Sequence, residues 1–586
     1  MQSFDLNLIL SIVTEVRTLD ELVVISGGCG VFQLMLVVCT YTSQICAVWG
    51  MLFMIFGNYH GAWRCESALV DPSYATSRGQ LDTTTALSGN ITTPPSDTID
   101  SGATFLSNMS GVSSLKDIPA SVLWNVSDMA TSVIRGSNES VFVRRCPGEG
   151  ESCRKIVYED SSATAVTQWN LICDQSWVQS FIISIQMTGV LLGSYVSGFL
   201  GDRCGRRVSL YGSICLHAVF NFLIVFSDSW RVFLALRFLI GFCIGGVLTS
   251  YFLYPMEFVS SWWRAVLGAL PVWNIGAATF SVMVYLLQDW RHIHLCTALL
   301  SLLYFLPVFW VPESLRWLAI HGHTDKAKRL VVRIARTNGR PSPPMSVLAM
   351  VSTEEVRRAA NNRFSYTLMD LFVDPVLRKV SLVMGFVWAC LALVYYSLSF
   401  GIKALSGDFY VNFLLFSVAE VPGMLFVAPA SNKLGRRVAS VLYFLLIGSA
   451  CIAVVFVSFL APEEVRGQAI TILAMVAKVH IQAVWMIVTL FCSELYPTVV
   501  RNQSSGFLNA CARLGGIAAP YLIPGSEETL YISFLVMGIS CLLCGLMLLT
   551  LKETKGNPLD DVIKTRHKLS VIAEETEEDL SDDGQL

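Results

Sequence analysis

The sequence is short of charge for a chain of this length. Aspartate, glutamate, lysine and arginine make up 15% of its 586 residues, whereas about 25% is usual for a soluble domain. Hydrophobic residues make up 53%, and the mean hydropathy is +0.56. This excludes an ordinary soluble protein, because much of the surface cannot face water. A net charge of −3 gives no support for nucleic-acid binding.

Sequence signatures of enzymes and of metal sites are missing too. The chain contains no Walker loop, no zinc-ligand spacing and no nucleophile triad in a supporting context. We therefore expect no enzyme activity, no cofactor and no bound metal.

The sequence has instead a series of apolar runs of about 20 residues, a length that crosses a bilayer as a helix. Twelve such runs predict an all-α membrane protein, at 31–57, 178–200, 208–227, 231–254, 265–287, 292–311, 377–400, 410–430, 438–460, 467–492, 503–524 and 530–551. The expected organisation is a cytoplasmic N-terminus (1–30), a first six-helix half (31–311), a cytoplasmic helical linker (312–376), a second six-helix half (377–551) and a cytoplasmic acidic tail (552–586).

A long polar loop, 58–177, follows the first span. It holds four N-glycosylation sequons, at Asn90, Asn108, Asn125 and Asn138. It also holds four of the 17 cysteines, which are disulfide candidates of undetermined pairing: Cys65, Cys146, Cys153 and Cys173. Both features indicate an extracellular loop.

The distribution of basic residues predicts the same orientation. The linker is rich in lysine and arginine, whereas the short loops assigned to the outside hold scattered charges. We expect a multi-pass protein of the plasma membrane with both termini in the cytoplasm.

The phrase "GRRV" occurs twice, at 205–208 and 435–438, each time between the second and third spans of a half. The repetition indicates an internal repeat of the kind found in secondary transporters. Glutamate and arginine seven residues apart also recur, at the inner ends of the fourth and tenth spans. We interpret these residues as a gate; anchoring and surface ion pairs are the alternatives: Asp202, Arg203, Arg206, Arg207, Glu257, Arg264, Arg436, Arg437, Glu494 and Arg501.

Several phrases resemble a known family. GDRCGRR is similar to the signature of the major facilitator superfamily, and VTQWNLICD (166–174), PESLRWL (312–318) and ELYPTVVRN (494–502) resemble the organic cation, organic anion and carnitine transporters of solute carrier family 22. The resemblance implies a twelve-helix fold and transport of small organic ions by alternating access. The chain departs from the pattern in having four loop cysteines rather than about six, and SNK in place of GDR in the second copy.

Four charges lie inside apolar runs, where a charge costs free energy: Arg237, Glu420, Lys478 and Arg513. Arg237 matches a superfamily position and is interpreted as structural. The other three are candidate substrate contacts if the eighth, tenth and eleventh helices face one cavity. The alternative is that Glu420 pairs structurally with Lys478 or Arg513.

Aromatic residues complete the candidate site. Trp388 and Tyr395 are seven residues apart and share one helical face, with Tyr396 beside them. The resemblance implies that this face lines the cavity, as do Phe413 and Trp485. Aromatic faces attract organic cations, although ordinary packing would explain each ring as well.

The substrate expected from these residues carries charge of both signs. The resemblance associates an arginine at position 513 with the organic anion and carnitine branches, whereas Glu420 suits a cation. The first choice is therefore a carnitine-like zwitterion or an organic cation, with an organic anion as the close alternative. A sodium ion, a proton or a counter-substrate is the candidate coupling partner. A non-transporting receptor of the same fold is disfavoured by the buried charges and the two loop motifs.

Replacing Asn90, Asn108, Asn125 and Asn138 together with Gln should collapse the protein to one band of deglycosylated mass. The reason is that only the loop 58–177 is expected to face the glycosylation machinery. Gel mobility before and after glycosidase treatment measures this, and residual glycosidase-sensitive mass in the quadruple variant would overturn the topology.

Overall fold

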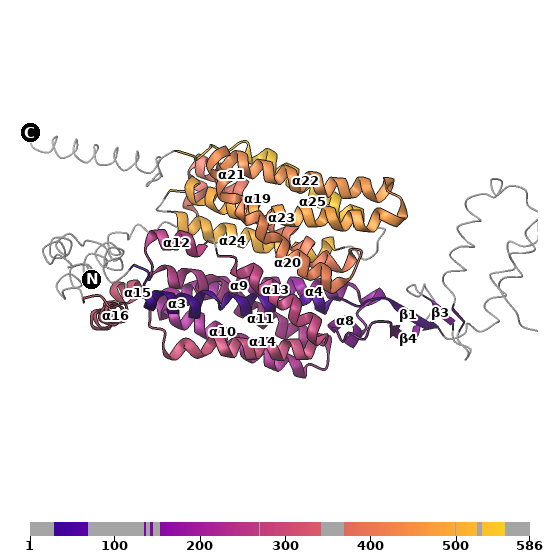
Figure 1. Ribbon diagram of the computed structural model, residues 1–586, viewed down its shortest axis with the longest axis horizontal. Helices are drawn as coiled ribbons and strands as arrows, with labels where there is room; N and C mark the ends of the chain where they lie inside the picture. The colour runs from indigo at the N-terminus through magenta and orange to yellow at the C-terminus, as the bar shows by residue number, and fades with distance from the viewer. Residues whose placement is uncertain are drawn as a thin grey trace, which may run out of the picture. The chain divides into compact units, whose positions relative to one another are not determined.

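The computed structural model describes residues 28–67, 134–135, 141–143, 153–268, 270–341, 368–497, 500–523 and 530–556. They form two units. The helical unit draws on residues 1–59, 163–169 and 175–586, and the loop unit on residues 60–162 and 170–174. Figure 1 labels the helices and strands of both.

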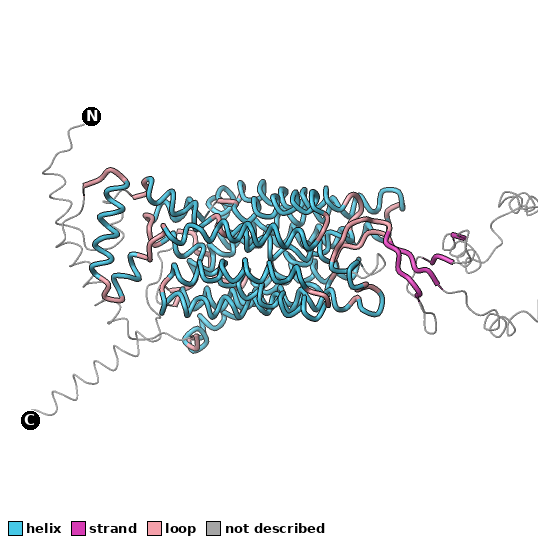
Figure 2. Tube along the Cα trace, turned by 90° about the horizontal axis from the view of Figure 1, so that it is seen from below, coloured by secondary structure: helices cyan, strands magenta, loops and turns pink. Residues whose placement is uncertain are grey.

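The first half of the helical unit contains six spans. α3 (Val31–Tyr41) and α4 (Gln44–Gly57) make the first, and the others follow in order: α9 (Trp177–Cys204), α10 (Arg206–Leu223), α11 (Trp230–Met256), α13 (Val272–Leu287) and α14 (Trp290–Phe305). The second half contains α19 (Pro375–Phe400), α20 (Phe409–Leu425) with α21 (Val427–Leu434), α22 (Arg436–Leu460), α23 (Glu463–Leu495), α24 (Arg501–Ala518) and α25 (Leu530–Leu548). Figure 2 shows these helices lying alongside one another.

Within the described residues, ten of these helical segments are long and apolar enough to cross a membrane. The two remaining spans are α13, an apolar helix of 16 residues, and α24, which contains Arg501 and Arg513. Together they account for the twelve spans predicted from the sequence. The fifth span, α13, is short, and the eleventh, α24, carries two arginines. Both supply residues to the candidate site.

Close approach of the helix backbones explains why glycine recurs inside the spans. A side chain at Gly193 of α9 would collide with the carbonyl of Phe242 on α11, and one at Gly515 of α24 would collide with the carbonyl of Ala389 on α19. Small residues allow backbones to pack closely in membranes, where dispersion contacts drive helix association. These contacts fix the position of α24, and therefore of Arg513, against α19.

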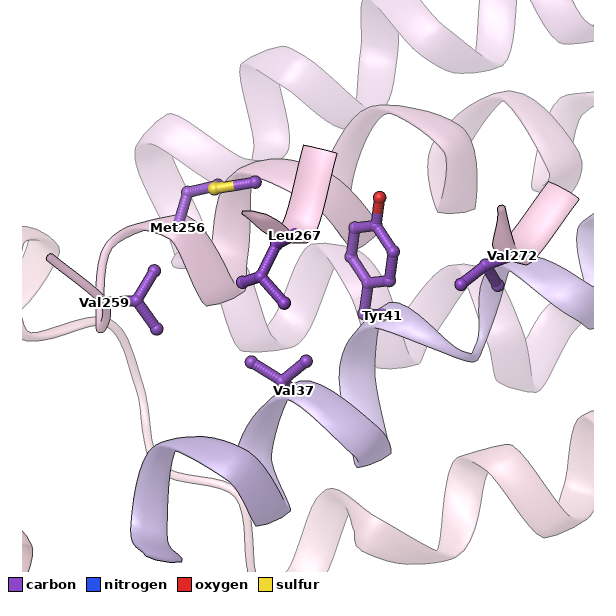
Figure 3. Packing of buried hydrophobic residues seen from close by; sticks show 6 residues of the cluster. All are labelled: Val37, Tyr41, Met256, Val259, Leu267 and Val272. Atoms are coloured by element: carbon purple, nitrogen blue, oxygen red, sulfur yellow. The ribbon is translucent and has the colours of Figure 1, made fainter. Parts of the chain in front are cut away.

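A buried apolar cluster lies where α3, the end of α11, α12 (Ser261–Gly268) and the start of α13 meet. Figure 3 shows its members side by side: Val37, Tyr41, Met256, Val259, Leu267 and Val272. Val272 begins α13, so this cluster anchors the helix that carries Trp273 and Asn274.

The linker begins with two helices, as expected, α15 (Leu315–Ile320) and α16 (Thr324–Thr337). α16 buries Leu330, Val331 and Ile334 while its basic residues point outward. Asn338 at its end accepts from the backbone N–H of Phe32 (3.0 Å) and donates to Gln33 (2.9 Å), which ties the linker to α3. α18 (Asp370–Val373) precedes α19.

The loop unit contains a sheet that the sequence did not predict. It is antiparallel in the order β2-β3-β1-β4, formed by β1 (Trp63–Ser67), β2 (Ile134–Arg135), β3 (Val141–Val143) and β4 (Cys153–Tyr158). Cys173 is disulfide-bonded, and the thirteen cysteines of the apolar runs are free. The predicted glycosylation sites and Cys146, like the termini 1–27 and 557–586, lie outside the described residues.

Candidate functional site

A buried ion pair lies at the centre of the second half. The ammonium of Lys478 on α23 is 2.8 Å from Oε1 of Glu420 on α20, and both side chains are almost fully buried. Lys478 also donates to Oγ of Ser399 at 2.6 Å and stands 3.7 Å from the ring centroid of Tyr395. An isolated buried charge is very unfavourable, so each partner offsets the desolvation of the other. The structure thus realises one of the two pairings that the sequence left open.

The first half reaches this pair through α13. Asn274 donates from Nδ2 to Oε2 of Glu420 at 2.5 Å, and Trp273 donates from Nε1 to the hydroxyl of Tyr395 at 2.7 Å. The sequence analysis missed both residues. The signal that could have found them is an asparagine, next to a tryptophan, inside an apolar run that is otherwise free of amides.

Arg513 lies apart from the ion pair. Its guanidinium donates to the hydroxyl of Tyr396 at 3.1 Å, and it forms no ion pair with any residue that the structure describes. Arg513 is half-buried, in contrast to Glu420 and Lys478. Of the three candidate substrate charges, Arg513 is therefore the one without a charged partner among the residues described.

The predicted aromatic residues divide into two groups. Trp485 lies 5.7 Å from Trp388 and 5.9 Å from Tyr395 between ring centroids, and Tyr395 lies 5.3 Å from Tyr396. These four rings contact one another in sequence, with Lys478 against Tyr395 and Arg513 hydrogen-bonded to Tyr396. Phe413 instead packs against Phe280 of α13, at 5.9 Å, in the contact between the halves.

The two "GRRV" motifs have matching contacts. Arg206 is 2.8 Å from Asp202 and 3.5 Å from Glu257, and Arg436 is 3.1 Å from Glu494. Asn432 occupies the position that corresponds to Asp202, so the second half lacks the first of these ion pairs.

A carboxylate caps the helix that begins at each motif. Glu313 accepts from the backbone N–H of Arg207 at 3.1 Å, and Glu553 accepts from those of Arg436 and Arg437 at 2.9 and 3.0 Å. Burial alone would raise the pKa of Glu553, but hydrogen bonds from backbone N–H groups outweigh it and lower the pKa below its ordinary value. The carboxylate is therefore negative at neutral pH, as suits a helix N-terminus.

The glycine of each motif makes this cap possible. Gly205 and Gly435 have φ of +107° and +92°, and a side chain at either would collide with the capping carboxylate. The sequence analysis missed Glu313 and Glu553, although a glutamate followed by serine or threonine ends the sixth and twelfth spans alike.

The remaining arginines predicted for the gate also have contacts. Arg264 donates to the carbonyl of Met256 at 2.9 Å, Arg501 to that of Tyr496 at 3.4 Å, and Arg203 lies 4.4 Å from the ring centroid of Phe199. The guanidinium of Arg207 donates to the carbonyl of Val308 at 2.6 Å. The Arg207 contact joins the first motif to the end of the sixth span.

Arg237 lies inside the first half and is fully buried. It donates to His294 at 2.5 Å and to the carbonyl of Gly50 at 3.2 Å, and its guanidinium lies 3.9 Å from the ring centroid of Phe53. Hydrogen bonds and an aromatic face thus stabilise this cation among α4, α11 and α14, which fits a structural role.

Comparison with known proteins adds the family. The family described as "Sugar (and other) transporter" matches residues 139–564. Human organic anion transporter 3 is 30% identical over 430 residues, 72% of this chain and 78% of that protein. The beta-alanine transporter of Drosophila melanogaster is 31% identical over 69% of this chain and 66% of its own length. The organic cation transporter protein of the same fly is 29% identical over 75% and 82%.

A solved structure has a similar fold. The inward-open xylose transporter XylE from E. coli superposes with a TM-score of 0.52 at 16% identity, over 65% of this chain and 88% of that one. The likeness concerns the arrangement of the twelve helices.

The single variants Glu420→Gln and Lys478→Met should each destabilise the protein by about 3–5 kcal/mol, because each leaves a buried charge without its partner. The double variant should recover most of that loss, since it removes both charges. Thermal unfolding of the purified protein in detergent measures the three variants. A double variant that is no more stable than the worse single variant would contradict the pairing.

Proposed function

Since the chain belongs to the sugar (and other) transporter family, and within it to the organic ion transporters of solute carrier family 22, we propose that the small organic ions it transports carry a carboxylate. The observation that carries this proposal is Arg513, a half-buried cation without a carboxylate partner among the described residues.

The charges beside Arg513 support the same conclusion. Glu420 would attract organic cations if it were free, but Lys478 neutralises it at 2.8 Å. Of the three candidate substrate charges, Arg513 is thus the one left uncompensated, and partial burial strengthens its attraction for an anion because it reduces screening by water. An arginine also presents two parallel N–H donors to a carboxylate, which adds geometric selectivity.

Among the alternatives left open by the sequence, this favours organic anions and zwitterions over cations that lack a carboxylate. A simple cation would meet Arg513 with like charge and would find Glu420 already paired. The aromatic surface of Trp388, Tyr395, Tyr396 and Trp485 would hold the apolar part of either substrate. One relative is named for beta-alanine, which bears such a group, and another is named for organic anions.

Contacts between the halves support alternating access. Near the outer ends, Lys403 after α19 donates to Gln179 of α9 at 2.8 Å, and Ser184 of α9 donates to the carbonyl of Ile517 of α24 at 2.8 Å. The cytoplasmic motifs bind within their own halves. We infer that the outer contacts break, and the motifs exchange partners, when the site opens outward.

We also propose that the termini are cytoplasmic, that the protein lies in the plasma membrane and that transport is coupled to a counter-substrate. The concentration of basic residues in the linker favours cytoplasmic termini, and the sequons favour the plasma membrane. A counter-substrate is favoured over sodium as the coupling partner, because the Lys478 ammonium already occupies the position beside Glu420 where a cation would bind.

Arg513→Gln should lower the apparent affinity for carboxylate substrates at least tenfold, since a charge-assisted bidentate contact is lost. Arg513→Lys is the matched control and should keep part of that affinity. The measurement is concentration-dependent uptake of an organic anion, a zwitterion and a quaternary ammonium compound, normalised to surface protein. If Arg513→Gln reaches the surface and weakens all three substrates equally, the substrate assignment is wrong.

A further inference from the structure

The side chain of Asn274 is only half satisfied. It is 2% exposed, and its Nδ2 donates to Oε2 of Glu420 at 2.5 Å. Its Oδ1 is buried and has no hydrogen-bond partner among the described residues. The orientation of the amide is fixed by chemistry, because the flipped amide would place its oxygen against the carboxylate.

A buried acceptor without a donor is uncommon in folded proteins, since it has lost its hydrogen bonds to water and gained none. The unpaired oxygen of Asn274 lies next to the candidate site, at the contact between the halves where α13 packs against α20. An N–H group of a bound molecule would complete the hydrogen bonding of this oxygen. The unpaired oxygen thus indicates a donor among the chemical groups of the substrate.

The groups next to this amide are already engaged with one another. The carboxylate of Glu420 lies on one side of Asn274. The hydroxyl of Tyr395 accepts a hydrogen bond from Nε1 of Trp273 at 2.7 Å and interacts with the same carboxylate. A protonated amine can donate an N–H bond to Oδ1 of Asn274 while Glu420 stays paired with Lys478 at 2.8 Å.

We propose that Asn274 determines specificity by selecting zwitterions whose positive group is a protonated amine over those with a quaternary ammonium. The proposal rests on the proposed function, because the carboxylate of the same substrate is assigned to Arg513. A protonated amine supplies the missing donor. A trimethylammonium group has no N–H bond, so it leaves Oδ1 unpaired and places three methyl groups where Asn274 is buried.

Because Asn274 lies at the contact between the halves, its preference for an amine also affects the transport step. Asn274 belongs to the first half and Arg513 to the second, so a zwitterion whose amine contacts Asn274 and whose carboxylate contacts Arg513 joins the halves. A ligand that binds one arrangement of the halves more tightly shifts the population toward it. Amine substrates therefore favour closure around the site, which quaternary substrates do not.

The test compares two substrates that differ only in N-methylation, β-alanine and its N,N,N-trimethyl derivative. Uptake into liposomes containing the purified full-length protein gives an apparent affinity for each. Wild type should prefer β-alanine at least tenfold, and Asn274→Leu should weaken β-alanine at least tenfold while changing the trimethyl derivative less than twofold. Equal wild-type affinities for the two substrates would overturn the proposal without reference to any variant.

Two further variants distinguish a role of Asn274 in specificity from a structural role. Asn412, a buried asparagine on α20, donates to the carbonyl of Ser406 at 2.9 Å, away from Glu420. Asn412→Leu should therefore leave the preference for β-alanine unchanged, and Asn274→Ser, which keeps a hydroxyl acceptor, should retain part of it. Equal loss of both substrates in Asn274→Leu and Asn274→Ser would show a structural role and overturn the inference.

Arg513→Gln in the same liposomes distinguishes this inference from the proposed function. Loss of both substrates in that variant, with a preference for β-alanine that Asn274→Leu does not alter, defeats the Asn274 inference alone. Unchanged uptake of both substrates in Arg513→Gln defeats the proposed function.

Discussion

The cost of burying a charge in a membrane protein is the constraint from which this structure is best understood. A charge inside the spans must have a partner, a set of hydrogen bonds or a use. Glu420 and Lys478 neutralise each other at 2.8 Å, and Arg237 is held by His294, by a backbone carbonyl and by the ring of Phe53. Arg513 has the hydroxyl of Tyr396 and remains half-buried, so we propose it as the charge that a substrate uses.

The internal repeat supplies the frame that holds these charges. In each half a glutamate caps the helix that follows the glycine of "GRRV", and a second glutamate pairs with the first arginine of that helix. These contacts stay within one half, whereas Asn274 and Trp273 reach from the first half to Glu420 and Tyr395 of the second. The candidate site thus lies where the two halves meet, which is where alternating access must act.

Much of this architecture follows from the sequence, and some of it could not. The apolar runs predict the twelve spans, and the cost of buried charge singles out Glu420, Lys478 and Arg513. Choosing Lys478 rather than Arg513 as the partner of Glu420 required the relative positions of α20, α23 and α24, which helical periodicity does not contain. Asn274 was not predicted as a site residue, because one asparagine in an apolar run is a common feature. Its partner, Glu420, lies on a helix of the other half, which the sequence pattern does not reveal. Phe413 shares the apolar character of the site aromatics, but it packs between the halves.

The central claim is that a substrate carboxylate binds Arg513 while Glu420 remains paired with Lys478. A structure of the protein with a bound zwitterionic substrate tests it most directly. The account predicts the carboxylate at the Arg513 guanidinium, beside Tyr396, with the Glu420–Lys478 pair intact. A carboxylate bound to Lys478 instead, with Glu420 released and Arg513 not in contact with the substrate, would contradict it.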